Sequence, residues 1–291
     1  MIGLEVREDD AVAVALDSDG RLVAQADARE PGDAAAAAVA ALGRLGPQVG
    51  PVAMASPAPE SDWCVAAIAA VARDTGTGVT GPVVASGTAA AIAEASAGAA
   101  RGVSNVVFFG IADHVSAGIL RDGLPLTGAG RAPALAWLGL NPVERDDYRR
   151  IGCLEAEVAS AGIVRRLVWR IKAGDRSRVG DAVGGELSAI TLEHILAAAR
   201  GGDGVSISVM RDTARYLAMA AANLALIVEP DVLVVGGIMA SAADLLLDAI
   251  RLEAARRLPP DITRALTIVP AMFAVEGPAI GAARFASAAP Q

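Results

Sequence analysis

The chain has 291 residues, of which 54% are apolar, 3% aromatic and 20% charged, and its net charge is −8. This composition excludes a disordered chain, which needs low hydrophobicity, and the length suits one large domain or two lobes. Acidic residues outnumber basic ones, and the sequence has no stripe of basic residues. The charge pattern of a nucleic-acid-binding protein is therefore missing.

The start of the chain and its cysteines suggest a cytoplasmic protein. An apolar segment at 2–6 opens the sequence, without the charged segment and apolar run of a signal peptide. No run of about 18 apolar residues predicts a membrane span. Cys64 and Cys153 are not clustered, which favours reduced thiols. We expect a cytoplasmic location and neither membrane nor nucleic acid as partner.

The first third of the chain predicts strands followed by alternating helices and strands. Three strands separated by polar turns are expected at 2–6, 11–17 and 22–27. Asp33 is a good cap for an alanine-rich helix at 33–45. The next elements are a strand at 52–55, a helix at 65–73, a strand at 83–84 and a helix at 88–100. This order is an α/β arrangement with a mixed sheet.

A second series of strands followed by helices begins near residue 104. The expected strands are at 105–111, 115–121, 232–235 and 266–269, and the expected helices at 153–172, 191–200, 206–227, 242–258 and 277–286. The 232–235 strand is apolar throughout, as in strands buried on both faces. We therefore expect an N-terminal lobe of residues 1–103 plus 277–291 and a C-terminal lobe of residues 104–276.

Two stretches of the second half are distinctive: Gly152-Cys153-Leu154-Glu155 at a helix start, and Glu-Pro-Asp-Val-Leu-Val-Val-Gly-Gly at 229–237. With stretches at 2–6, 101–107, 121–123 and 277–283, they resemble in order the ROK family of repressors and glucokinase-like sugar kinases. The resemblance implies a two-lobed, actin-like ATPase (ribonuclease H-like) α/β fold with mixed sheets.

The phosphate-binding positions differ from those of the family. Its kinases follow the first strand with a Gly-Gly-Thr turn, whose N–H groups cradle phosphate. Here Glu5 lies on the strand, and the turn is Arg7-Glu8-Asp9-Asp10. The family's second phosphate loop, Gly-Thr-Gly, aligns with Ala112-Asp113-His114. These carboxylates would repel a triphosphate, so no cofactor is expected; ATP and Mg²⁺ would be needed only by a kinase.

The catalytic base is also replaced. In the family an Asn-Asp pair precedes an alanine-rich helix, and the Asp takes a proton from the sugar hydroxyl. Ala85 and Ser86 stand at those positions, and a serine hydroxyl is no base at neutral pH without an activator. We therefore assign no catalytic residue and expect Ser86 to be a helix cap or turn residue. Asp113 is the fallback base, ahead of Glu5 or Asp62.

The family's zinc and sugar positions are mostly lost. Leu135 and Leu138 replace its Glu-x-x-His motif, and Cys153 alone remains of four zinc ligands, so no metal site is expected. Asp146 could ligate in principle, and a site of Glu5, Glu8, Asp9 and Asp113 is an alternative. The segment Gly128-Ala129-Gly130-Arg131 corresponds to glycines beside the family's sugar.

Besides Cys153, three positions keep family residues. Glu155 matches a sugar-contacting glutamate, although a carboxylate in the first turn of a helix is favoured in any case. Gly236 and Gly237 match the turn that passes the nucleotide, although a tight strand-to-helix turn needs glycines anyway.

These substitutions predict a non-catalytic protein that binds a sugar or another ligand, or acts through a partner. The first alternative is an ATP-dependent hexose kinase with a rearranged site. The second is a ROK-type transcriptional regulator lacking its DNA-binding domain, since no helix-turn-helix segment is found. Family analogy suggests a homodimer or association with a paralogue, and a small sugar as ligand.

Overall fold

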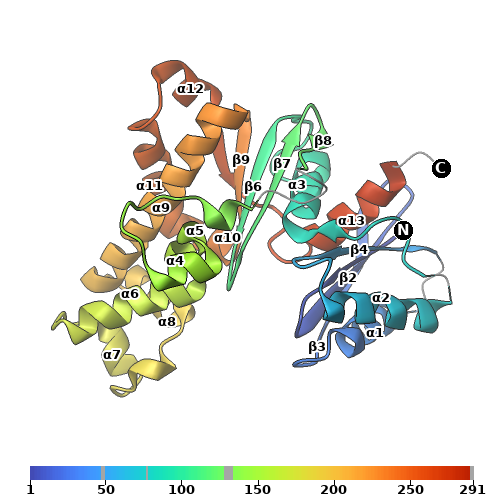
Figure 1. Ribbon diagram of the computed structural model, residues 1–291, viewed down its shortest axis with the longest axis horizontal. Coiled ribbons are helices and arrows are strands. Elements are labelled where there is room, and N and C mark those ends of the chain that lie inside the picture. Colours follow the sequence, from blue (N-terminus) through green and yellow to red (C-terminus); the bar gives the residue numbers. More distant parts are fainter. Residues whose placement is uncertain (47–49, 77, 128–133, 289–291) are drawn as a thin grey trace. The chain divides into compact units, whose positions relative to one another are not determined.

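The computed structural model describes residues 1–46, 50–76, 78–127 and 134–288 (Figure 1). Contacts within the chain divide it into two compact units. The first comprises Met1–Phe108, Ala117–Pro133 and Ala271–Gln291, and the second Phe109–Ser116 and Ala134–Pro270. Both contain helices and strands, in agreement with the α/β class. The expected lobe limits at 103/104 and 276/277 stay a prediction.

A mixed five-stranded sheet forms the centre of the first unit, in the order β3-β2-β1-β4-β5. The strands are β1 Ile2–Val6, β2 Asp10–Leu16, β3 Leu22–Arg29, β4 Val52–Ser56 and β5 Val84–Ala85. The first three strands pair antiparallel, because short polar turns join them, whereas β4 lies parallel to β1 after a helical crossover. All five residues of β1 are buried at the middle of this sheet.

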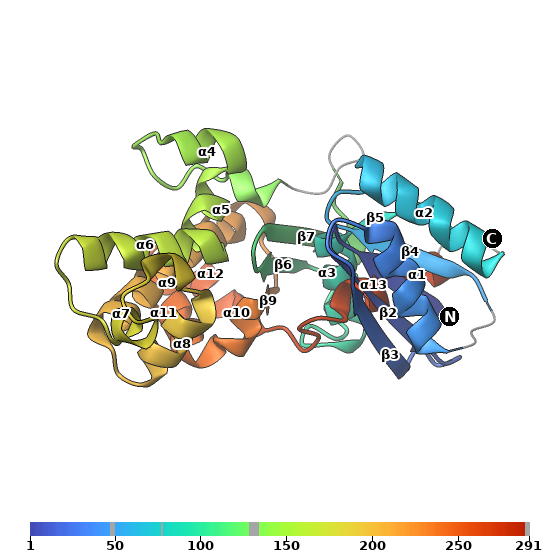
Figure 2. The ribbon, with the colours of Figure 1, turned by 90° about the horizontal axis from the view of Figure 1, so that it is seen from below.

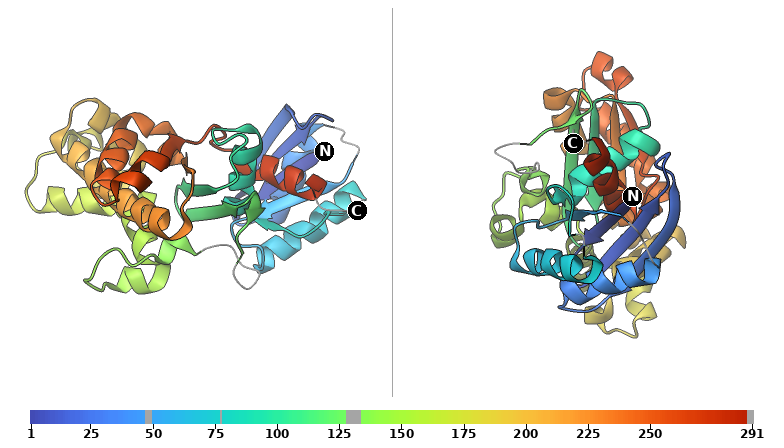
Figure 3. Two further views of the ribbon diagram at one scale, coloured as in Figure 1. Left: turned by 90° about the horizontal axis from the view of Figure 1, so that it is seen from above. Right: turned by 90° about the vertical axis from the view of Figure 1, so that its right-hand side faces the viewer.

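Helices cover both faces of this sheet (Figure 3). They are α1 Ala34–Leu45, α2 Asp62–Thr75, α3 Ser86–Ala97 and α13 Gly277–Ala288. Leu4 and Met54 pack towards α1 and α2, and Val14 packs towards α3 and α13. A Cβ atom at Gly281 of α13 would lie 1.7 Å from the carbonyl oxygen of Ala89, so glycine permits close helix contact.

A second mixed sheet has the order β10-β9-β6-β7-β8. Its strands are β6 Val106–Ile111, β7 Val115–Arg121, β8 Leu124–Pro125, β9 Val232–Gly237 and β10 Thr267–Pro270. The interior of β9 is buried, as its apolar sequence predicted, and β10 runs parallel to it.

The second unit is rich in helices (Figure 2). They are α4 Asp146–Ile151, α5 Cys153–Val158, α6 Ser160–Lys172, α7 Arg178–Ala182, α8 Leu192–Arg200, α9 Gly204–Val228, α10 Ile238–Ser241, α11 Ala243–Ala255 and α12 Pro260–Ala265, with short 3-10 helices at Leu135–Trp137 and Leu187–Ala189. The long α9 contacts α5, α6, α8 and α11. None of the helices described has the length and apolarity needed to cross a bilayer.

Two helix predictions were wrong in detail. The helix expected at 153–172 is broken at Ala159, which has an extended backbone, and the N–H of Ser160 bonds to the Ala112 carbonyl at 3.0 Å. A tertiary hydrogen bond thus fixes a break that the helical sequence pattern did not signal. The helix expected at 242–258 ends at Ala255, and Pro260 begins α12, since proline suits a first helical turn.

Candidate functional site

A partly buried charge cluster occupies the turn after β1. Glu5 is 3% exposed, and its Oε2 accepts a hydrogen bond from Arg7 Nη1 at 3.1 Å. Arg7 Nε donates to the Asp10 carboxylate. Burial raises the pKa of Glu5, although Arg7 acts to lower it. Burial would lower the pKa of Arg7, but Glu5 and Asp10 reverse this and raise it. The Arg7 guanidinium is therefore held between two carboxylates.

The backbone and side chains of the same turn bond to the protein itself. The N–H of Arg7 bonds to the Asp10 carbonyl at 2.9 Å, and Asp9 Oδ1 accepts the N–H of Gly32 at 2.8 Å. Glu8 is exposed. This is a closed acidic turn, and it differs chemically from a glycine turn that offers N–H groups to an anion.

Ser86 is the first residue of α3 and lies near Glu5. It is not the helix cap that the sequence suggested, because Ala85, with an extended backbone, takes the cap position. Ser86 is 4% exposed, and its Oγ completes no hydrogen bond with a described residue. The hydroxyl lies near enough to Glu5 to lower the pKa of that carboxyl. Glu5 and Ser86 thus form a buried polar pair at the end of β1.

In the second unit, Glu155 fastens the turn between β6 and β7. It is 8% exposed; Oε2 accepts the N–H of Val115 at 2.8 Å, and Oε1 lies 3.1 Å from His114 Nδ1. Asp113, in the same turn, is exposed. A ligand that contacts Glu155 would therefore share its carboxylate with His114 and Val115.

The fold explains the second glycine of the pair at the end of β9. Gly237 has φ +68° and begins α10. A Cβ atom there would lie 2.5 Å from the carbonyl oxygen of Ile111. Backbone geometry and close approach both require glycine, so its presence does not identify a nucleotide site.

The family's zinc positions lie apart from any cluster of ligands. Leu135 is buried in a short 3-10 helix, Cys153 is buried at the start of α5, and Asp146 is exposed on α4. No three His, Cys, Asp or Glu side chains of the described residues gather closely enough to hold a metal ion. Asp62 is exposed at the start of α2. The segment 128–131 lies outside the described residues.

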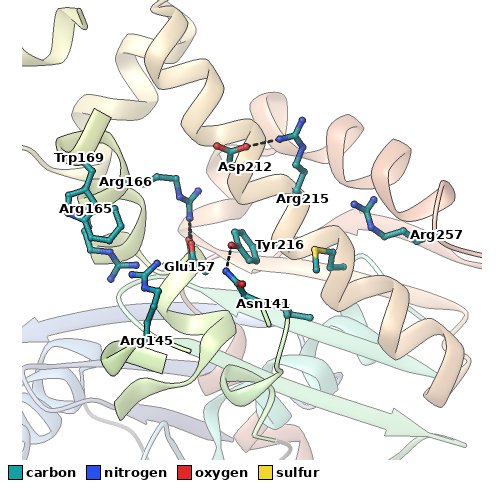
Figure 4. A pocket seen from close by; sticks show the side chains of 12 residues that line it. Asn141, Arg145, Glu157, Arg165, Arg166, Trp169, Asp212, Arg215, Tyr216 and Arg257 are labelled. Atoms are coloured by element: carbon teal, nitrogen blue, oxygen red, sulfur yellow. Dashed lines mark hydrogen bonds and ion pairs between the residues drawn. The ribbon is translucent and has the colours of Figure 1, made fainter. Parts of the chain in front are cut away.

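The segment that aligns with the family's zinc ligands is instead held by a network of hydrogen bonds and ion pairs around Glu157. The sequence analysis did not predict this network. Glu157, 4% exposed, accepts from Arg145 Nη1 at 2.9 Å, Arg166 Nη2 at 3.0 Å and Tyr148 Oη at 2.5 Å. Burial, followed by the Glu157 contact, raises the pKa of Tyr148. The network joins α4, α5 and α6, and Figure 4 shows its Arg145, Glu157 and Arg166 side chains. The charged residues of the network, Arg145, Glu157 and Arg166, are well separated in sequence, and no local pattern links them.

The ROK family model matches residues 21–289. A glucokinase of Halalkalibacterium halodurans is 29% identical over 168 residues, 56% of this chain and 50% of that relative. The DNA-binding transcriptional dual regulator NagC of Escherichia coli is 28% identical over 55% of the chain and 38% of the regulator. The matches thus span half or less of these curated relatives.

One solved structure, a ROK family glucokinase from Streptomyces griseus in complex with glucose and AMPPNP, superposes with a TM-score of 0.82. It is 24% identical, and the match covers 99% of both chains. At this identity the likeness establishes the fold, and it confirms the predicted two-lobed, actin-like architecture.

Proposed function

Because the chain belongs to the ROK family, as its motifs predicted, we propose that it is a sugar-binding member that does not transfer phosphate. The observation that carries this proposal is the closed turn after β1. Arg7 is bonded to Glu5 and Asp10 at the position where the family resemblance calls for an open glycine turn. A triphosphate would have to displace this cluster and would meet its carboxylates.

The base position supports the same conclusion. Ser86 cannot accept the sugar proton by itself, and a positioned base contributes about 10²–10⁴-fold to rate. Losses in phosphate binding and in proton transfer act on separate steps, so they compound. Ligand binding needs neither the base nor the phosphate turn, and Glu155 is retained at the family's sugar position.

The direct test combines a coupled ADP-release assay with a thermal-shift screen of hexoses, N-acetylated hexosamines, sugar phosphates and ATP. We expect no ATP-dependent turnover, and stabilisation by a sugar of about 2.7 kcal/mol at 100 times its Kd. Glu155→Gln should weaken that stabilisation, and Glu8→Gln, an exposed change in the other unit, is the control. Turnover near 1 s⁻¹, within the ordinary range of enzymes, would overturn the proposal.

The second candidate is an ATP-dependent hexose kinase with a rearranged site. Two observations favour it: the glucokinase relative, and the buried Glu5 with a raised pKa beside Ser86, a combination typical of general bases. If turnover is found, its loss in Glu5→Gln would assign Glu5 as the base, and its loss in Asp113→Asn would assign Asp113. ATP and Mg²⁺ would then be the cofactors.

Family analogy also underlies a proposal about assembly. A homodimer, or a pair with an active paralogue, would give a non-catalytic member a route to regulate sugar metabolism. Light scattering across micromolar concentrations tests the homodimer, and a monomer throughout that range would contradict it.

A further inference from the structure

A basic hollow of about 510 Å³ lies in the second unit (Figure 4), and Glu155, Gly236 and Gly237 are not among its lining residues. Its volume is within the range of small-molecule sites. Five arginines and two carboxylates are among its lining residues: Arg145, Arg165, Arg166, Arg215, Arg257, Glu157 and Asp212. The chain as a whole is acidic, with net charge −8, so this local excess of positive charge is opposite to the average surface.

The arginines of the rim have partners of their own. Arg215 pairs with Asp212 at 2.9 Å, and Arg257 pairs with Glu253 at 2.8 Å. The inner arginines Arg145, Arg165 and Arg166 share two carboxylates. Asp147 Oδ2 accepts Arg145 Nη2 at 2.6 Å and Arg165 Nη1 at 2.7 Å, whereas Glu157 binds Arg145 and Arg166. This inner cluster therefore carries one positive charge more than its carboxylates neutralise.

Arg165 is the member whose bonding is incomplete. Its Nη2 donates to the Ala156 carbonyl at 2.7 Å, but its Nε–H is buried and has no hydrogen-bond partner among the described residues. Burial and the neighbouring Arg145 charge lower the pKa of Arg165. Like-charged guanidiniums held side by side on one carboxylate are an arrangement that an added oxyanion stabilises.

The wall beside these guanidiniums is aromatic and apolar. Arg145 Cζ and Arg165 Cζ each lie 5.1 Å from a ring centroid of Trp169, which is 52% exposed. Leu140 and Met219 line another part of the hollow. A ligand with a charged group at the arginines would thus find apolar surface for its uncharged part, and arginine forks match phosphate oxygens in two-point contacts.

We propose that this hollow binds a small molecule through a phosphate group, with Arg145 and Arg165 as its principal ligands. The site is independent of whether the chain phosphorylates sugars, because none of its residues belongs to the family's kinase positions. Phosphate supplies the missing negative charge, and its oxygens accept hydrogen bonds from the guanidinium groups that line the hollow. Trp169 lies against both arginines and would report the binding.

The test is a titration with inorganic phosphate at constant ionic strength, followed by Trp169 fluorescence in a Trp63→Phe/Trp137→Phe variant and by calorimetry in the natural sequence. We expect saturable binding, and Arg165→Gln should weaken it by about tenfold, the effect of one charge-assisted hydrogen bond. Arg149→Gln, which removes an exposed arginine of the same unit, should leave the affinity unchanged. Asp212→Asn, which removes a rim carboxylate, should tighten binding and does not disturb the buried network.

Non-saturable binding, or equal affinity in the Arg165→Gln and natural proteins, would overturn the proposal. Acetate that binds more tightly than phosphate would replace the phosphate class with a carboxylate. Light scattering on the same samples tests whether a second protein chain occupies the hollow instead. If Arg165→Gln changes the oligomeric mass and phosphate does not bind, the hollow is a protein interface and the proposal is wrong.

Discussion

Arg7 Nη1 lies 3.1 Å from Oε2 of Glu5, a carboxylate that is 3% exposed at the centre of a sheet. A buried carboxylate is costly without a counter-charge. Arg7, two residues after Glu5 in the chain, supplies that charge. Its side chain thereby occupies the turn after β1. The ion pair thus links the stability of the first unit to the chemistry of its altered turn.

Arg7→Ala should destabilise the protein and make its stability depend more strongly on pH. Arg7 is 38% exposed, so solvent screening reduces the cost of breaking the buried pair to about 1–3 kcal/mol. The folded pKa of Glu5, already raised, should rise further. Stability is then greatest below the ordinary glutamate pKa of about 4.3 and falls as the pH rises through the folded value.

Urea unfolding at several pH values measures this effect. Arg7→Ala/Glu5→Gln should recover most of the loss at neutral pH, because no buried charge remains. Arg21→Ala, which removes an arginine that is 78% exposed, should change the stability by less than about 0.5 kcal/mol. A loss in Arg7→Ala that does not vary with pH would show that Glu5 does not depend on Arg7.

Ser86→Asp should not restore kinase activity. The new carboxylate would lie beside Glu5 in a buried site, and two adjacent carboxylates resist simultaneous ionisation. We expect no turnover in a coupled assay and a loss of stability that is greater at pH 8 than at pH 5. Ser86→Asn, similar in shape but uncharged, is the control and should lack the pH dependence. Phosphorylation by Ser86→Asp would contradict our account of the phosphate turn.

Much of the first unit was predictable because its signals are local. Polar turns set the antiparallel strands, and Asp33 caps α1 by accepting the N–H of Ala36 at 2.9 Å. The closed turn after β1 was predictable only in part. The sequence showed its acidic residues, but the ion pairs that they form with Arg7 depend on the folded structure. The Glu157 network was missed because its arginines lie nine and twelve residues from Glu157 in sequence. No local pattern encodes such a contact.

Gly237→Ala should destabilise the second unit even without nucleotide. Its φ of +68° and ψ of −151° lie in a region that glycine alone populates readily, and a Cβ atom would meet the Ile111 carbonyl. The combined cost should exceed about 3 kcal/mol, given 1–3 kcal/mol for the backbone alone.

Chemical unfolding provides the measurement, with Gly184→Ala as the matched control. Gly184 also has a positive φ, +61°, but nothing lies within 4 Å of its Cβ direction. We expect about 1 kcal/mol for the control, the cost of a left-handed residue. Equal losses of unfolding free energy in the two variants would mean that the close approach to Ile111 contributes nothing to the cost.

The Asp203 carboxylate should contribute strongly to the stability of the helices in the second unit. Its Oδ2 accepts Ser177 Oγ at 2.9 Å and the N–H and Oγ of Ser206 at 2.9 and 2.8 Å, while Oδ1 accepts the N–H of Arg178 at 3.0 Å. One carboxylate thus caps α9 and holds the start of α7. Burial would raise the pKa of Asp203, but these hydrogen bonds reverse that effect and lower it.

Because the folded pKa is below the unfolded one, the stabilisation by Asp203 is present above the ordinary aspartate pKa of about 3.9 and is lost as the pH falls through the folded value. Asp203→Ala should cost about 3 kcal/mol at pH 7, since several buried donors lose a charged acceptor. Asp33→Ala removes a helix cap with a single bonded N–H and should cost about 1 kcal/mol. Thermal unfolding at pH 7 and at pH 3 separates the two. The difference between the natural protein and Asp203→Ala should shrink at the lower pH, and a difference that stays constant would show that the charge on Asp203 contributes nothing.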